Sequence, residues 1–349
     1  MDLTETSRPV LHPLVEQLLA DERLSAFAEA LPAAARVSEP VLPLVLAALH
    51  ERLGKALVVL LPEDADARDA AEAARWLLGE ERVALLPSRG VRWGSGLEPP
   101  PHLVGERARA LDVLAAGGLV CCSAASLAEP LPPSGARPEP IVLGRAEAPG
   151  LDALAERLAL AGYERVDRVQ ERGQFAVRGG LADVFPATGR DPLRIELFGD
   201  EIEAIRAFSP FTQRALHDVD HALVYPAAER RLDLVEPSFR DELEGLSPGR
   251  VPNDLVPVLD RPVDLVWQPD DVRAVWEEEE SGPNPGLSNT VLLGLIEGAA
   301  ELDSLPQGQE HAFEGQRPAL AARGLAEAET ELTGFLRGGN RVKIGRAHV

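Results

Sequence analysis

Three short, continuous apolar runs, separated by segments of helical periodicity, constrain the fold of this chain more than any other feature. The runs are KALVVLLP at 55–62, RVALLP at 82–87 and GLVCCSAASL at 118–127, the last of which begins as a strand. The helical patterns cover 41–53, 63–78 and 106–115. Runs of this kind are typical of strands buried on both faces of a parallel sheet, and their alternation with helices predicts an open α/β sheet.

The pattern changes after a proline-rich stretch at 130–140. Closely spaced runs with period-two alternation take over, most clearly at Arg194–Phe198 and Glu201–Ile205, and the FGDE segment between them supplies a hairpin turn. Leu151–Tyr163 has the apolar spacing of an amphipathic helix. We therefore predict an α/β domain over 1–128, followed by a smaller, antiparallel β-rich domain with one packed helix over 129–226.

A weaker α/β pattern returns after residue 226. Residues 263–267 predict a buried strand, and residues 306–318 predict a polar linker. The remaining patterns predict helices at 270–280, 290–303 and 319–337. We assign 227–305 to the second part of the α/β domain and 306–343 to the start of a further, truncated domain.

The last six residues, IGRAHV at 344–349, are what a common sequencing-adapter string translates to in one frame. We expect the natural sequence to end near Lys343, and the chain to be a fragment of a longer gene product.

The charge balance excludes some classes of partner. The chain has 57 acidic and 35 basic residues, a formal net charge of −22, which on average repels nucleic acid and anionic membranes. No apolar run approaches the roughly 18 residues of a membrane span, and MDLTETSRP at the start lacks the features of a signal peptide. We expect a cytoplasmic protein with no membrane partner.

The sequence does not support a nucleotide-binding site. A phosphate-binding loop needs Gly-rich backbone, a Lys and a following Ser or Thr, and it follows a strand. Lys55 comes after Gly54 but before a strand. Leu49 stands where the first Gly should be, and Ala56 where Ser or Thr should be. The slot before the helix at 41–53, ALPAAARVSEPVLP, has no Gly and no Lys. We expect no catalytic residue, cofactor or ATP hydrolysis in this chain.

Two other groups allow a chemical interpretation. HDVDH at 217–221 places His217 and His221 four residues apart, as for a metal on one helical face, whereas the alternative is a solvated connector between domains. The adjacent Cys121 and Cys122 cannot make a disulfide framework and fit the core of a strand better than a redox site. In both cases we favour the structural interpretation and predict no metal site.

The most specific motifs lie in Tyr163–Leu216: YxxVDxVxxRGxFxVRGGxxDVFP, then RIELFGDEIExIRxF, then TQR. In these motifs the chain resembles the UvrA-interaction domain shared by the excision-repair protein UvrB and the transcription-repair coupling factors. The TQR ending, the empty phosphate slot and the presence of only two tyrosines make it more similar to the coupling factors. The resemblance implies a degenerate helicase-like (RecA-like) α/β domain that the β-rich domain interrupts.

The resemblance also implies a function. The chain would be a non-catalytic adaptor that recruits UvrA to RNA polymerase stalled at DNA damage, in transcription-coupled nucleotide excision repair. Missing C-terminal domains would bind RNA polymerase and double-stranded DNA and would use ATP and Mg. The alternative is a UvrB-type ATPase that loads onto damaged DNA, and a third possibility is a module that only restrains the missing motor. A nucleotide-binding assay separates the first two.

The resemblance assigns partner binding to Arg178 of the VRGG motif and to Arg194 and Phe198 of RIELF, with Arg172 as a weaker candidate. A large aromatic beside an arginine on a polar face is typical of a contact surface. We expect substitutions at Arg178, Arg194 and Phe198 to leave folding intact, because none of the three lies on the predicted core face.

The period of a strand separates these residues from the core. Residues i, i+2 and i+4 share a face, so Arg194, Glu196 and Phe198 point one way, and Ile195 and Leu197 point toward the core. In the alternative arrangement, Arg194 pairs with Glu196 or with a neighbouring strand, and Phe198 tucks under the FGDE turn.

Overall fold

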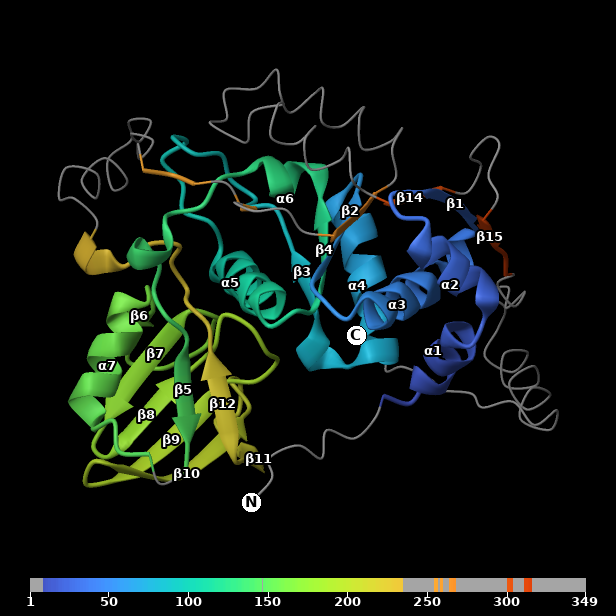
Figure 1. Ribbon diagram of the computed structural model, residues 1–349. Coiled ribbons are helices and arrows are strands. Elements are labelled where there is room, and N and C mark those ends of the chain that lie inside the picture. The colour runs from blue at the N-terminus through green and yellow to red at the C-terminus, as the bar shows by residue number, and fades with distance from the viewer. Residues whose placement is uncertain are drawn as a thin grey trace, which may run out of the picture.

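The computed structural model describes residues 9–145, 147–234, 254–256, 258–259, 264–267, 300–303 and 311–315. Over these residues the chain forms a seven-stranded parallel sheet and a six-stranded, mostly antiparallel sheet, which lie next to each other with helix α5 (Pro101–Ala115) at their junction (Figure 1). Among the described helices, none combines the length and apolar character needed to cross a membrane.

The parallel sheet is built from segments on both sides of the β-rich region. Its strands, in spatial order, are β15 (His311–Phe313), β1 (Ala34–Val37), β14 (Ala300–Asp303), β13 (Asp264–Trp267), β2 (Leu57–Leu61), β4 (Leu119–Ser123) and β3 (Val83–Leu86). All residues of β2, β3 and β4 are buried, as their continuous apolar runs predict. The mixed α/β architecture with a parallel sheet is therefore confirmed.

Helices cover both faces of this sheet. On one face, α3 (Leu42–Leu53) and α4 (Asp64–Leu78) pack with α1 (His12–Leu19) and α2 (Glu22–Glu29), and on the other face lie α5 and α6 (Ala124–Ala128). Gly54 ends α3 in the left-handed region at φ 67°, where a residue without a Cβ is favoured. Cys121 and Cys122 are buried on opposite faces of β4. Burial raises the pKa of the Cys121 thiol to about 12, which suits a core residue and not a reactive one.

Two predictions for the C-terminal part of the parallel sheet are wrong. Residues 300–303 form strand β14 instead of the end of a helix, and residues 311–313 form strand β15 instead of part of a polar linker. Both strands pair with β1, and Leu302 and Phe313 join the core, so tertiary pairing overrides the local pattern. The predicted helices at 270–280 and 319–337, and the terminal IGRAHV segment, lie outside the described residues.

The second sheet has the order β11 (Ala215–Val219), β10 (Glu201–Phe208), β9 (Leu193–Phe198), β8 (Leu181–Val184), β7 (Gln174–Arg178) and β6 (Glu164–Arg165). The strands from β7 to β11 are antiparallel, and the short β6 differs from the prediction by pairing parallel to β7. Helix α7 (Leu151–Leu160) packs on the inner face, and β5 (Ile141–Gly144) pairs with β12 (His221–Val224) beside it. Short 3-10 turns complete the described chain at Glu39–Val41, Glu80–Arg82, Ser134–Ala136 and Leu232–Leu234.

The β-rich sheet packs directly against α5. A Cβ added to Gly105 of α5 would lie 2.7 Å from the Cβ of Ala187, and one added to Gly173 would lie 2.7 Å from the Cγ of Pro101. Both contacts are too close for a side chain to fit without movement of the neighbouring atoms. Glycine at these two positions therefore allows the segments that precede β7 and follow β8 to lie against the first turns of α5.

Candidate partner-binding site

The outer face of the six-stranded sheet is the candidate site. Registers across β8, β9, β10 and β11 place Asp183, Arg194, Arg206 and Asp218 in one row, with an aspartate at each end and the two arginines between them. The opposite face holds Ile195 and Leu197 against the core under α7, as predicted from the alternation in β9. The polar and the core faces of β9 are therefore separated as the sequence indicates.

Asp183 is the central group of this face. Its carboxylate accepts two hydrogen bonds from Arg194, from Nε and from Nη2, each 2.7 Å long. The guanidinium of Arg178 approaches the same carboxylate at 3.6 Å. Asp183 is only 4% exposed, whereas 57% of the Arg178 side chain is exposed. Hydrogen bonding to Asp183 raises the pKa of Arg194 above its ordinary value, so this guanidinium keeps its positive charge.

The Arg194 pairing decides between the alternatives for this side chain. Arg194 pairs with the neighbouring strand through Asp183, and Glu196 pairs instead with Arg206. The expectation that folding survives substitution of Arg194 is therefore not supported. Removal of its guanidinium would leave a buried carboxylate without its main partner, which costs about 3–5 kcal/mol.

Phe198 lies at the end of β9, just before a two-residue turn in which Gly199 has φ 63°. Its ring is 82% exposed, so it does not tuck under the turn. Leu181, on the same face at the adjoining end of β8, is also partly exposed. Large exposed apolar groups mark contact surfaces, and arginine, which this face also carries, is among the residue types enriched at hot spots.

Arg172 lies away from the other three candidates. It precedes β7, whereas Arg178 is the last residue of that strand, so the two lie at opposite ends of β7. Arg172 donates to the backbone oxygen of Gly189, stacks on Phe185 and lines a cavity of about 270 Å³ between α4, α5 and the 187–189 loop. The structure brings Arg178, Arg194 and Phe198 to one face and places Arg172 at the junction with α5.

The histidine cluster does not form a metal site in the described part of the chain. His217 lies on β11 and His221 begins β12, so the predicted helical spacing does not apply. Asp218 pairs with Arg206 at 3.2 Å, and Arg145 contacts Asp220 at 3.6 Å. Among the described residues no group of three or more metal-binding side chains converges. The segment is therefore an exposed connector between two strands.

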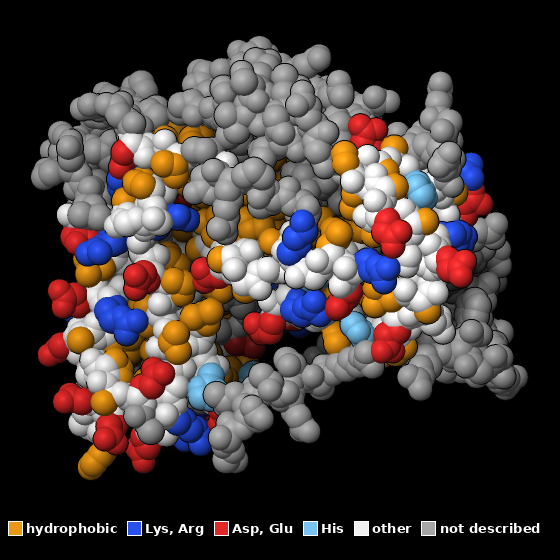
Figure 2. Space-filling model, in the orientation of Figure 1, with side chains coloured by type: hydrophobic (Ala, Val, Ile, Leu, Met, Phe, Trp, Pro, Cys, Tyr) orange, Lys and Arg blue, Asp and Glu red, His pale blue; other side chains and the backbone are white. Residues whose placement is uncertain are grey.

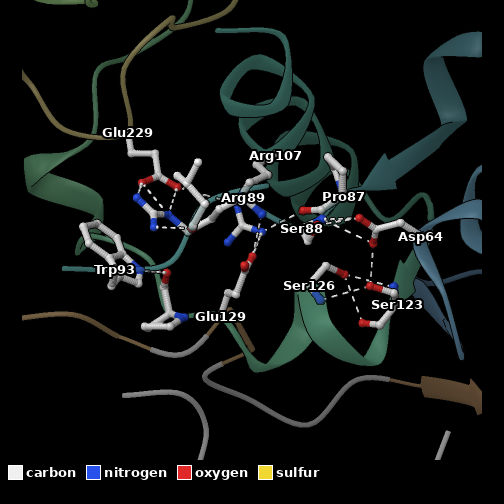
Figure 3. Close-up of polar contacts among 12 residues, drawn as sticks. Asp64, Pro87, Ser88, Arg89, Trp93, Arg107, Ser123, Ser126, Glu129 and Glu229 are labelled. Atoms are coloured by element: carbon white, nitrogen blue, oxygen red, sulfur yellow. Dashed lines mark hydrogen bonds and ion pairs between the residues drawn. The ribbon is translucent and has the colours of Figure 1, made fainter. Parts of the chain in front are cut away.

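A buried ionic network lies at the junction between α5 and the β-rich domain, and it was not predicted from the sequence (Figure 3). Arg89 donates to both carboxylate oxygens of Glu229 at 2.9 Å, and its guanidinium lies 3.6 Å from the ring centre of Trp93. Arg107 of α5 donates to Glu129 at 3.2 Å and lies 3.7 Å from Glu229. Glu129 precedes the strands from β5 to β12 and Glu229 follows them, so the network joins both flanking segments to the parallel-sheet layer.

A second polar cluster lies at the carboxyl ends of β2, β3 and β4, where α/β sheets often bind ligands. Asp64 accepts a 2.6 Å hydrogen bond from the Ser88 hydroxyl and a 2.5 Å hydrogen bond from the Ser123 hydroxyl, and Ser123 and Ser126 form a capping box (Figure 3). These side chains bind one another and thereby tie three strand ends together.

The pH dependence of stability should show the burial of Glu129. Burial raises the pKa of this carboxyl from 4.5 to about 7. Between those values the folded state keeps a proton that the unfolded chain releases, so the free energy of unfolding falls as the pH rises from about 4.5 to about 7. Glu129→Gln, which can accept the same hydrogen bonds, should flatten this slope in denaturant titrations at about pH 5 and about pH 8. Glu139→Gln, at an exposed position, is the matched control, and a slope unchanged by Glu129→Gln would contradict the assignment.

Comparison with known protein families finds a match for one part of this architecture. Residues 141–229 match the UvrB interaction domain family, over the two-stranded sheet, α7 and the six-stranded sheet. The chain therefore contains a UvrB interaction domain.

The relatives extend the match beyond that domain. The transcription-repair-coupling factor of Mycobacterium bovis is 38% identical over 191 residues, which is 52% of this chain and 15% of that protein. The factor of Escherichia coli is 29% identical over 60% of this chain and 19% of its own length. The UvrABC system protein B of Thermotoga neapolitana is 33% identical over 102 residues, which is 27% of this chain. The resemblance to the coupling factors is confirmed over about half of this chain, which spans less than a fifth of the length of those relatives.

Proposed function

We propose that this chain is an adaptor that binds UvrA and recruits it to RNA polymerase stalled at DNA damage. The observation that carries the proposal is that the exposed Phe198 and Arg178 share the outer face of a UvrB interaction domain. Arg178, Arg194 and Phe198 form the proposed contact face. Contacts of the whole protein with RNA polymerase and DNA, and an ATP-driven translocase activity, are part of the proposal and would require segments outside this chain. We propose that the protein acts in the cytoplasm.

The surface in Figure 2 supports a protein partner more than a nucleic-acid partner. On the side of the β-rich domain visible at the lower left, over α7, β5 and β12, acidic and basic side chains are interspersed without a broad basic stripe. The charge row across β8 to β11 likewise contains both signs, because an aspartate flanks the two arginines at each end. Nucleic-acid backbones need clustered positive charge, whereas a row of both signs can select one protein partner by complementary charges.

We propose that the parallel-sheet layer is a degenerate helicase-like (RecA-like) domain without a working phosphate loop. Strand β1, the turn at 39–41 and helix α3 give the strand–loop–helix order of a nucleotide site. The turn contains Glu39 and Pro40, and Pro43 lies in the first turn of α3, and neither proline has a backbone N–H to offer a phosphate. Ser38 is engaged with Gly315, whose N–H donates to the Ser38 hydroxyl at 2.8 Å. We infer that this loop supports the sheet and does not bind nucleotide.

We therefore expect no saturable ATP binding in the micromolar range. Isothermal titration of the full chain with ATP and Mg should give only dilution heats, because the loop after β1 has neither the Lys nor the Gly-rich backbone that hold a triphosphate. An ATPase measured under the same conditions is the positive control. Saturable micromolar binding or hydrolysis would favour the alternative of a UvrB-type ATPase.

Titration of UvrA with the full chain tests the adaptor proposal. We expect saturable binding that UvrB competes away, since both would use a UvrB interaction domain. Binding that UvrB does not displace would place the contact on another surface, and the absence of binding would overturn the adaptor function.

A further inference from the structure

We infer that Asp183 is a positioning residue for the contact face, that Arg194 acts on UvrA binding through Asp183, and that Arg178 is the arginine that contacts the partner. This inference rests on the proposed function. It assigns different roles to Arg178 and Arg194, which the sequence motifs do not distinguish.

The register of the sheet sets the different distances. Asp183 and Arg194 are directly opposite each other on β8 and β9. Asp183 is opposite Ala176 on β7, so Arg178, two residues further along, is a diagonal neighbour. Direct cross-strand neighbours are closer than diagonal ones, which agrees with contacts of 2.7 Å for Arg194 and 3.6 Å for Arg178.

Arg194 is held on two sides. One edge of its guanidinium forms the two-pronged pair with Asp183, and the guanidinium carbon lies 4.8 Å from the ring centre of the buried Phe208. If an acidic group of the partner formed an ion pair with Arg194 in place of Asp183, Asp183 would stay buried without its hydrogen-bond donor. Partner binding therefore cannot draw Arg194 away without a large penalty.

Arg178 has no such constraint. The contact with Asp183 at 3.6 Å is an ion pair without a hydrogen bond, and more than half of the side chain is in water. A carboxylate of the partner can form an ion pair with the Arg178 guanidinium while Arg194 continues to neutralise Asp183. The structure thus leaves Arg178 available on the face that carries Phe198 and holds Arg194 in its pair with Asp183.

This division has an unusual consequence for substitutions. Without Arg194, the buried Asp183 carboxylate has Arg178 as its nearest cation among the described side chains, and it should draw Arg178 inward and away from UvrA. Removal of the Asp183 charge in the same molecule should release Arg178 again. A defect caused by the loss of Arg194 should therefore be suppressed by the loss of Asp183.

The experiment is a titration of UvrA with the full chain in matched variants, with circular dichroism as the folding control. We expect Arg194→Gln to weaken binding by about tenfold or more, and Asp183→Asn/Arg194→Gln to bind within about threefold of the unsubstituted chain. The double variant leaves no buried orphan charge, so it should fold even if Arg194→Gln alone does not. Arg178→Gln and Asp183→Asn/Arg178→Gln are the controls, and both should stay weak.

A double variant at Asp183 and Arg194 that folds and binds UvrA tenfold or more weakly than the unsubstituted chain would show a direct Arg194 contact and would overturn the inference. Failure of the proposed function has a different signature. In that case Arg178→Gln and Phe198→Ala would both bind as tightly as the unsubstituted chain.

Discussion

Replacement of Arg89 by methionine should lower the free energy of unfolding by about 3–5 kcal/mol. Arg89 and Glu229 are 3% and 8% exposed, and the guanidinium binds both oxygens of the carboxylate. Methionine retains much of the volume against Trp93 but, among the described residues, leaves the buried Glu229 with Arg107, at 3.7 Å, as its remaining ion-pair partner. Breaking a buried ion pair from one side costs more than the pair itself contributes, because the remaining charge has lost its solvation.

Chemical denaturation of the unsubstituted chain and of the Arg89→Met variant at neutral pH measures this loss of stability. Arg231→Met is the matched control, because Arg231 pairs with Asp233 in an exposed ion pair. Such pairs contribute about 0–1 kcal/mol, so the control should change little. Equal losses in the two variants would mean that the junction network has no special role in stability.

Phe198→Ala should weaken UvrA binding by about 2 kcal/mol or more, which is roughly a thirtyfold rise in Kd. The ring is exposed in the free protein, so its burial against a partner would supply new apolar contact area. Charge reversal in Arg178→Glu should cost about 2–5 kcal/mol of binding free energy if the pair is buried in the complex. Folding should be unaffected by Phe198→Ala because the ring makes no part of the core.

Phe211→Ala is the control for this prediction. Phe211 is 88% exposed and follows β10, whereas Phe198 precedes it, so the two rings lie at opposite ends of that strand. Calorimetric titration of UvrA with each variant compares the two positions. If both phenylalanines, or neither, affect binding, the contact is not centred on Phe198.

Local features of the fold follow from the sequence alone. The strands β2, β3 and β4, the end of α3 at Gly54 and the turn at Gly199 all lie where apolar runs and glycine predict them. The separation of the polar and core faces of β9 was also predictable. These features depend on periodicity and backbone conformation within a few residues, and both can be predicted from the local sequence.

The chemistry of the candidate site depended on long-range pairing. The sequence could place Arg194 on the polar face, but only the register of β8 against β9 gives it Asp183 as a partner. Asp183 stands in the DVFP part of the motif, and its period-two position on a strand was the available signal. Arg172 belongs to the same motif, yet the turn into β7 directs it to the junction with α5.

The sequence by itself determined the class of fold, the positions of the local elements and the face that carries Phe198. Only the tertiary structure decided that residues 300–303 and 311–313 return to the sheet as strands beside β1. It alone paired Arg89 with Glu229, 140 residues further along the chain. The physical reason is that such contacts depend on which segments the folded chain brings together. Two charges that would contribute little to stability in water contribute decisively once they are buried, because breaking the pair then leaves one charge unsolvated.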